Sequence, residues 1–214
     1  MMKKIFALGL VILAVLVTSS AQARPKYSDK NVKQVESYLN SIKSMRADFV
    51  QIASNGEKIE GRLYIEKPNK IRMEYNKPSD ILIVGNGDYI VYYDRELEQV
   101  TNIDYDEVPA AMILANTVKL DGKELSVTDF YQDPGVTKIG LQYNKTEDLG
   151  PFTLVFANNP FELKQWKVVM PQGLEVSLSL YNTVTDGKLD EELFTFRKTK
   201  EVPSHRRRGG AKRK

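Results

Sequence analysis

Side chains that could do acid–base, nucleophilic or metal chemistry are few in this chain of 214 residues. His205 is its one histidine and it has no cysteine, which excludes catalytic triads, thiol nucleophiles and metal sites built on His or Cys. The acidic stretches 104–107 and 190–192 lack the spaced oxygen ligands and the glycine of a dedicated calcium loop. The Asn86-Gly87 step fits a hairpin turn and not a phosphate loop. We therefore expect no enzyme, no metal and no cofactor, and binding becomes the expected class of function.

The apolar residues provide a possible binding surface. Within 70–75, Ile71, Met73 and Tyr75 alternate with three charged side chains, as in a strand with one apolar and one solvated face. An interior lined by such side chains would hold an apolar ligand by burial, at about 0.8 kcal/mol per methylene. The same residues would also fill an ordinary core, and taken alone they favour that simpler interpretation.

The elements that would position these residues are mostly strands. A helix is expected over 29–42, where Val32, Val35, Leu39 and Ile42 recur at spacings of three and four. A short apolar helix is expected over 109–115, opened by Pro109. The pattern predicts a mainly β fold, with one antiparallel sheet curled into a barrel or half-barrel. Strands are expected at 46–51, 62–66, 70–75, 81–84, 89–93, 98–103, 136–143, 152–156, 163–169, 174–181 and 193–196.

Residues 1–23 have the pattern of a secretory signal peptide. Lys3 and Lys4 precede an uncharged apolar run over 5–17, and Ala21-Gln22-Ala23 supplies the small-x-small cleavage pattern. The apolar run is shorter than the roughly 20 residues that a membrane-spanning helix needs. No cysteine follows the cleavage site, so no lipid anchor is expected, and the mature protein would begin near Arg24.

The charges divide the rest into one acidic domain, 24–204, and a basic tail, 205–214. Two of the 31 Lys and Arg residues lie in 1–23 and six in 205–214, so 23 remain against 28 acidic residues, a net charge of −5. An acidic domain is not expected to bind nucleic acid. The tail is expected to be disordered. It is either a solvated extension or a segment attracted to anionic lipid headgroups or lipopolysaccharide.

One ordered set of motifs resembles a known family. These motifs are Phe49-Val50-Gln51, the run from Gly61 to Tyr75, Asn86-Gly87, Tyr92-Tyr93-Asp94 and Glu98-Gln99-Val100-Thr101. Together they resemble the periplasmic outer-membrane lipoprotein carriers, the LolA family. The resemblance is densest over 49–101 and extends weakly to 196.

The resemblance implies an incomplete antiparallel barrel with a helical lid over a hydrophobic cavity. It also implies a monomeric periplasmic carrier that is neither an enzyme nor a nucleotide-binding protein. An ATP-driven transporter of the inner membrane would release lipoproteins to it, and a lipoprotein receptor of the outer membrane would receive them. With the alternation, it indicates that acyl chains contact Leu63, Ile65, Ile71, Met73, Tyr75, Val91, Tyr93, Met112, Ile113 and Leu114.

Two departures from the family pattern bear on the site. Lys67 stands where the family has an arginine that holds the lid, so a weaker latch is expected at Lys67, or one supplied elsewhere, for example by Arg62. Lys67 could equally be a surface lysine. Met73 and Val91 replace aromatic residues, which favours a wider or less selective cavity. Two alternatives stay open: a carrier of another lipid or glycolipid, and a periplasmic sensor of lipid or lipoprotein.

Overall fold

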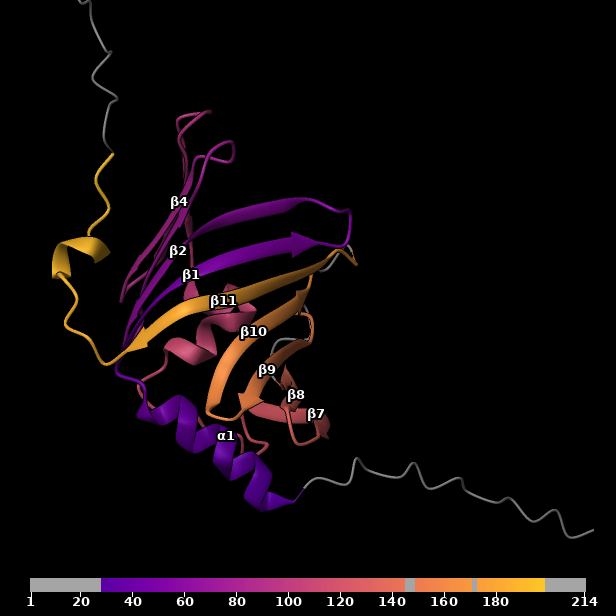
Figure 1. Ribbon diagram of the computed structural model, residues 1–214. Helices are drawn as coiled ribbons and strands as arrows, with labels where there is room; N and C mark the ends of the chain where they lie inside the picture. Colours follow the sequence, from indigo (N-terminus) through magenta and orange to yellow (C-terminus); the bar gives the residue numbers. More distant parts are fainter. Residues whose placement is uncertain (1–27, 145–148, 171–172, 199–214) are drawn as a thin grey trace, which may run out of the picture.

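The computed structural model describes residues 28–144, 149–170 and 173–198. The expected signal peptide at 1–23 and the expected tail at 205–214 lie outside these residues, so both stay predictions. The described residues form one open antiparallel sheet with α1 (Asp29–Ser41) across one end (Figure 1). This confirms the mainly β fold with an N-terminal helix.

The sheet contains eleven strands in the order β6-β5-β4-β3-β2-β1-β11-β10-β9-β8-β7. Strands β6 and β7 end this order and do not pair with each other among the described residues, so the barrel is incomplete. The strands are β1 (Ser44–Ala53), β2 (Lys58–Glu66), β3 (Lys70–Tyr75), β4 (Ile81–Asn86), β5 (Ile90–Asp94), β6 (Gln99–Ile103), β7 (Leu125–Gln132), β8 (Val136–Tyr143), β9 (Phe152–Asn158), β10 (Phe161–Val169) and β11 (Glu175–Thr185).

Helix α1 forms where the apolar spacing predicts it. Val32, Val35 and Leu39 lie on one face and are all buried. Ser28 is the N-cap residue and has extended backbone angles, but its side chain makes no capping hydrogen bond. The helix therefore depends on its apolar face, and that face packs into the main core cluster.

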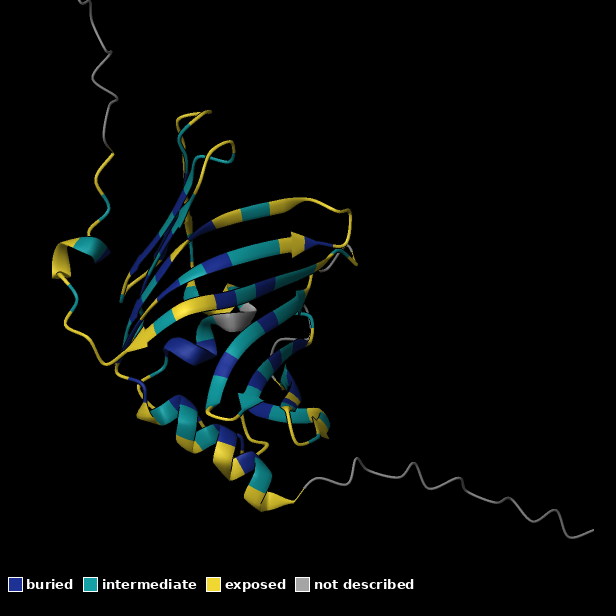
Figure 2. Ribbon diagram, viewed as in Figure 1, coloured by how far each residue is buried: buried dark blue, intermediate teal, exposed yellow. Residues whose placement is uncertain are grey.

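The register of the strands assigns their side chains to two faces. Met45 pairs with Ile65, and Ile65 pairs with Ile71, so these residues share one face. We call this the inner face, because it packs in one cluster with residues of α1 and of η2 (Pro109–Leu114), a 3₁₀ helix. The opposite face is the outer face. Figure 2 shows buried residues along the strands and on the short helix inside the curve of the sheet.

A glycine shapes the inner face at β2. Gly61 lies opposite Phe49 in the register, and a Cβ at this position would collide with the Phe49 ring. The missing side chain therefore lets the Phe49 ring lie against Gly61 in the core, where Phe49 is fully buried. Phe49 also meets the edge of the Tyr75 ring, with 5.1 Å between the ring centroids.

Two expected elements differ in the structure. The sequence pattern does not predict strand β7, because a bulge between Val127 and Asp129 breaks the two-residue alternation of this strand. The expected strand at 193–196 is wrong: residues Glu191–Phe194 form a 3₁₀ helix, η3. The Asp190 side chain accepts a hydrogen bond from the Glu192 amide at 3.0 Å and so starts this turn.

Candidate functional site

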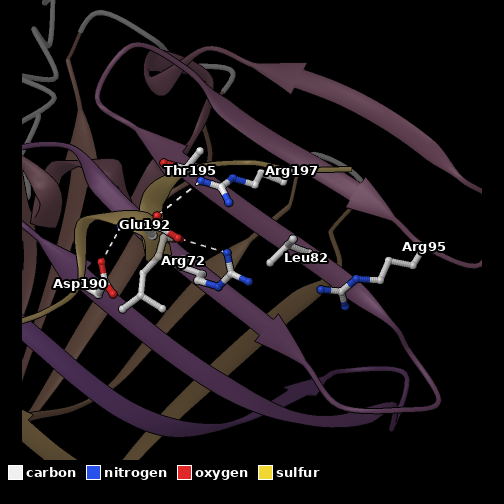
Figure 3. A pocket seen from close by; sticks show the side chains of 8 residues that line it. Arg72, Leu82, Arg95, Asp190, Glu192, Thr195 and Arg197 are labelled. Atoms are coloured by element: carbon white, nitrogen blue, oxygen red, sulfur yellow. Dashed lines mark hydrogen bonds and ion pairs between the residues drawn. The ribbon is translucent and has the colours of Figure 1, made fainter. Parts of the chain in front are cut away.

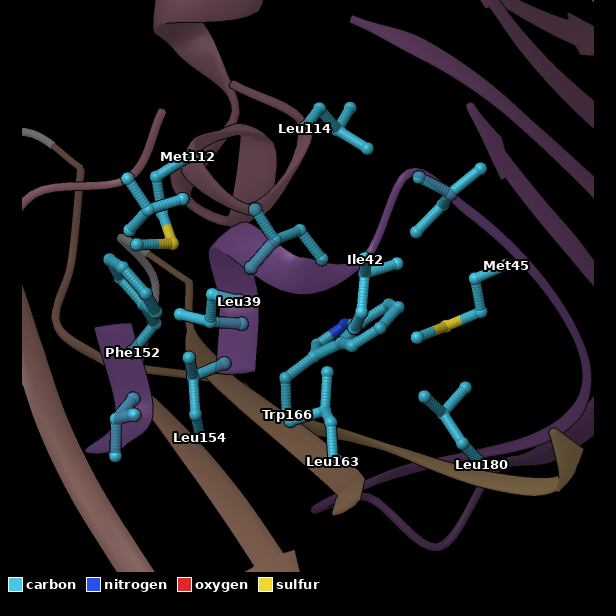
Figure 4. Close-up of a cluster of buried hydrophobic side chains, with 14 of the residues drawn as sticks. Leu39, Ile42, Met45, Met112, Leu114, Phe152, Leu154, Leu163, Trp166 and Leu180 are labelled. Carbon is cyan, nitrogen blue, oxygen red and sulfur yellow. The ribbon is translucent and has the colours of Figure 1, made fainter. Parts of the chain in front are cut away.

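The inner face brings together eight of the ten residues expected to contact acyl chains. Seven belong to the main buried cluster and Tyr75 packs against it, half-buried. In Figure 4, Met112 and Leu114 of η2 lie in one cluster with Leu39 of α1 and with Ile42, the residue after this helix. Side chains from the strands complete the cluster. The eight are Leu63, Ile65, Ile71, Met73, Tyr75, Met112, Ile113 and Leu114.

The other two expected residues lie on the outer face. Tyr93 pairs with Leu82, and Val91 pairs with Val84. Ile83 lies between Leu82 and Val84 in β4 and is on the inner face, so these four residues are on the outer face. Leu82, Val84 and Tyr93 form a second small cluster with Phe196 packed against it. The expectation that Val91 and Tyr93 share one cavity with the other eight is therefore corrected.

The side chains around η2 are closely packed on the side that faces α1, β2 and β10. A cavity of about 20 Å³ lies where these elements meet, beside Leu39, Ile65, Ile113 and Leu163. A space of this size holds about one water molecule. Ile113 is 5% exposed and Leu114 is 2% exposed, so the apolar side of η2 is packed against the inner face. The described conformation is thus closed.

The segment after η2 is fastened to α1 by side chains that the sequence did not single out. The Asn40 amide donates to the Val118 carbonyl oxygen at 2.9 Å, and the Val118 amide donates to Asn40 Oδ1 at 2.7 Å. The Leu120 amide donates to Glu36 Oε2 at 3.3 Å. The partners lie 78 and 84 residues apart in the chain, so no local pattern could have indicated these contacts.

A second set of hydrogen bonds holds η2 and the residues that precede it. The Asn69 amide donates to the Leu114 carbonyl oxygen at 2.9 Å. The Tyr105 hydroxyl donates to the Asn69 carbonyl oxygen and accepts from the Gly87 amide at 3.2 Å. Burial raises the pKa of Tyr143 to about 12, against the opposing effect of a hydrogen bond with the Met112 backbone. We call residues 105–118, which include η2, the lid, and these contacts tie it to the sheet.

Lys67 does not hold the lid, which corrects the expected latch. Its Nζ donates to the Leu39 carbonyl oxygen at 2.7 Å, in the last turn of α1. That carbonyl lacks a partner within the helix, so Lys67 caps it. Arg62 does not act as the latch in place of Lys67 either, since it lies on the outer face and is largely exposed. Its Nε lies 3.7 Å from Asp48 Oδ1. Burial lowers the pKa of Lys67 to about 8, and the charge of Lys43 acts in the same direction.

Lys67 should make stability depend on pH. Its pKa is about 8 in the folded chain against an ordinary value of 10.5, so the unfolded chain binds more protons between these values. The free energy of unfolding should therefore gain from Lys67 as the pH rises through this window. Lys67→Arg keeps the charge and does not titrate there. We expect the Tm of the wild type, relative to that of Lys67→Arg, to rise between pH 8 and about 10. A constant difference would contradict the assignment.

The outer face carries a hollow of another kind. The residues after β11, 186–198, which we call the strap, run along this face and form the hollow with β3, β4 and the β5–β6 turn (Figure 3). The hollow has a volume of about 270 Å³ around Leu82. Its arginines already have partners, as in the pair of Arg95 with Asp80 at 3.1 Å. The Arg72 guanidinium also donates to the Leu193 carbonyl oxygen at 3.0 Å. The Arg72 hydrogen bond attaches the strap to the sheet, and the charged lining does not suit an acyl chain.

Sites of other kinds are not found in the described part of the chain. Residues 28–144, 149–170 and 173–198 contain no group of three acidic, His or Cys side chains arranged to hold a metal ion. Within the same ranges, no helix has the length and apolar character needed to cross a membrane.

Several known proteins are similar to this chain. An uncharacterised protein of Rickettsia prowazekii is 27% identical over 198 residues, covering 92% of this chain and 88% of that protein. The outer-membrane lipoprotein carrier protein of Pseudoalteromonas translucida is 25% identical over 195 residues, covering 75% of this chain and 93% of that protein. The protein of the same name from Chromobacterium violaceum is 39% identical over 92 residues, covering 40% of this chain and 45% of that protein. A solved LolA superfamily protein of Nitrosomonas europaea covers 77% of this chain and 97% of its own, with a TM-score of 0.45 and 8% identity.

The family model decides the relationship. The model described as outer membrane lipoprotein carrier protein LolA matches residues 40–197. This range runs from the last turn of α1 through every strand to the strap, and it includes the lid and the whole inner face. The chain therefore belongs to the LolA family of outer-membrane lipoprotein carrier proteins.

Proposed function

We propose that the protein carries lipoproteins across the periplasm by holding their acyl chains against the inner face of the sheet. One observation carries the proposal most: η2 buries Met112, Ile113 and Leu114 against the inner face, where we propose that acyl chains bind. The lid of the closed form thus acts as an internal substitute for the cargo. No catalytic step is required of any residue, and we propose no enzymatic activity.

Loading would exchange one set of apolar contacts for another. When acyl chains enter, they bury the inner face in place of the η2 side chains, so the free energy lost on displacing the lid is largely regained. A ligand can only shift the lid by its difference in affinity for the open and closed forms. The exchange is therefore close to balanced, and cargo can pass to a receptor that binds it more tightly.

The partners follow from the family relationship as parts of the proposal. The cargo would be outer-membrane lipoproteins, released to the carrier by an ATP-driven transporter of the inner membrane. A lipoprotein receptor at the outer membrane would accept them. The expected signal peptide at 1–23 supports a periplasmic location, and we propose that the carrier works as a monomer.

Native mass spectrometry of the chain purified from periplasm tests the proposal. We expect an acylated lipoprotein bound at one copy per chain. Ile83→Glu places a charge beside the main cluster on the inner face and should reduce the bound cargo, because a carboxylate there repels acyl chains. Val100→Glu is the matched control, since Val100 pairs with the outer-face residue Tyr93 and is 40% exposed.

The same experiment separates the proposal from its alternative. A free lipid or glycolipid in place of lipoprotein would favour a carrier of another lipid. Met45, Met73 and Met112 all lie in the interior, and such flexible side chains adapt to varied ligands, which is the observation that favours this alternative. An empty protein that also takes no lipoprotein from inner-membrane vesicles would contradict both.

A further inference from the structure

Lys67 places a positive charge beside the apolar interior of the sheet. Its side chain lines the cavity of about 20 Å³ together with Ile65, Ile113 and Leu163. Its Nζ donates to the Leu39 carbonyl oxygen at 2.7 Å, and the residue is half-buried. The apolar stem of the side chain therefore contacts the interior, while the ammonium lies at the boundary with solvent.

No carboxylate is paired with this ammonium in the part of the chain that the structure describes. The ion pairs between described residues do not include Lys67. An ammonium has three donors, and the Leu39 carbonyl oxygen accepts from one of them. Capping the helix thus needs a single donor, and two donors remain for water or a ligand.

A second lysine adds to the positive charge at this boundary. Lys43 lies between α1 and β1, and the Lys67 amide donates to its carbonyl oxygen at 2.8 Å. The charge of Lys43 is close enough to lower the pKa of Lys67. Asp186 offsets part of this charge, since its carboxylate accepts from the Lys43 amide at 2.9 Å. Two ammonium groups beside an apolar interior favour a ligand that joins an anionic head to an apolar chain.

We propose that the interior also binds free fatty acids, with the carboxylate on the Lys67 ammonium and the chain beside Ile65 and Leu163. The chain would take the place of Ile113 when the lid moves, and in this respect the inference rests on the proposed function. It goes beyond that function because the ester- and amide-linked chains of a lipoprotein carry no carboxylate that could pair with Lys67.

The two parts of a fatty acid would use the two parts of this site. Burial of the chain supplies most of the affinity, as it would for any acyl ligand. The carboxylate is ionised at neutral pH, and its pairing with a half-buried ammonium adds a contribution that depends on charge. A neutral chain of the same length gains the first contribution and not the second. Lys67 would therefore select among acyl ligands by their head group.

Competition binding at neutral pH tests the inference on the chain purified from periplasm and stripped of lipid. The reporter is the neutral dye N-phenyl-1-naphthylamine, and the competitors are dodecanoate and 1-dodecanol, which share a chain length and differ in charge. Lys67→Met keeps an apolar stem and removes the charge. In this variant we expect the affinity for dodecanoate, relative to that for 1-dodecanol, to fall about fivefold to tenfold. Lys67→Arg keeps the charge and should keep the preference.

The affinity for 1-dodecanol shows whether the interior of each variant is intact, and it should stay at the wild-type value. Lys70→Met is the matched control, because Lys70 lies on the outer face and pairs with Glu66 at 3.2 Å. It should leave the ratio of the two affinities unchanged. An equal ratio in the wild type and Lys67→Met would overturn the inference. An equal fall in Lys70→Met would overturn it too, because net charge alone would then explain the preference.

A palmitoylated peptide separates this inference from the proposed function. A chain that binds the peptide but prefers dodecanoate equally with and without the Lys67 charge would overturn the fatty-acid site alone. A chain that binds neither the peptide nor the two competitors would contradict the proposed function as well.

Discussion

Replacing Ile113 with alanine should lower the free energy of unfolding by about 2–5 kcal/mol and, at the same time, tighten the binding of an acylated peptide. The stability is lost because Ile113 is 5% exposed and its truncation enlarges the cavity beside Leu39 and Ile65. Affinity should increase because the lid then competes less well with acyl chains for the inner face. The two effects have opposite signs only if this side chain fills the place of the cargo.

Chemical denaturation and titration with a fluorescent palmitoylated peptide would measure both effects. Leu82→Ala is the matched control, since Leu82 is 4% exposed but belongs to the outer cluster. It should lose stability without a gain in affinity. Weaker binding by Ile113→Ala would show that Ile113 contacts the cargo directly, and the account of the lid as its substitute would then be wrong.

Asn40→Ala should release the lid from α1 and lower the free energy of unfolding by about 2–3 kcal/mol. The substitution leaves both backbone groups of Val118 without the side-chain partner that they have at 2.7 and 2.9 Å, in a residue that is 2% exposed. Alanine is the better helix former, and this offsets a few tenths of a kcal/mol of the loss.

Asn40→Asp separates the two hydrogen bonds. Aspartate can still accept from the Val118 amide but cannot donate to its carbonyl oxygen. The free energy of unfolding of Asn40→Asp should therefore lie between that of the wild type and that of Asn40→Ala. Urea unfolding measures this order, and limited proteolysis within 115–120 should follow it. Equal stability of all three chains would mean that the pair does not fasten the lid.

Local patterns were enough to predict most of the framework. The spacing of Val32, Val35 and Leu39 predicted α1, and the strict alternation over Ile71 and Met73 placed the correct side of β3 on the inner face. These predictions succeeded because each pattern reflects one apolar and one solvated face of its own element. The short apolar helix after Pro109 was also identified, as η2.

Strand β5 shows where such patterns fail. Ile90, Val91 and Tyr93 are all buried, because the strap covers part of the outer face, so the strand has no clear alternation. The sequence could not indicate which side of β5 faces inward, and a shift of one residue reverses every assignment. The motif Tyr92-Tyr93-Asp94 does not indicate on which face of the sheet the Tyr93 side chain lies.

The contacts that hold the lid were beyond the sequence for another reason. Asn40 and Tyr105 bond to backbone atoms that become neighbours only when the sheet closes around η2. Polar residues in a helix or a short turn are common, so neither residue stood out. Lys67 drew attention by its place in a family motif, yet its partner is α1.

Amide hydrogen exchange, with and without a bound diacyl lipopeptide, tests the central claim most directly. In the closed form the Ala111, Ala115 and Val118 amides are hydrogen-bonded to Val108, Met112 and Asn40, respectively. If acyl chains replace η2 on the inner face, these amides should exchange at least about tenfold faster in the loaded protein, while those of β1 and β11 stay protected. Unchanged or slower exchange of the lid amides on loading would contradict the claim, because the cargo would then be bound without displacing the lid.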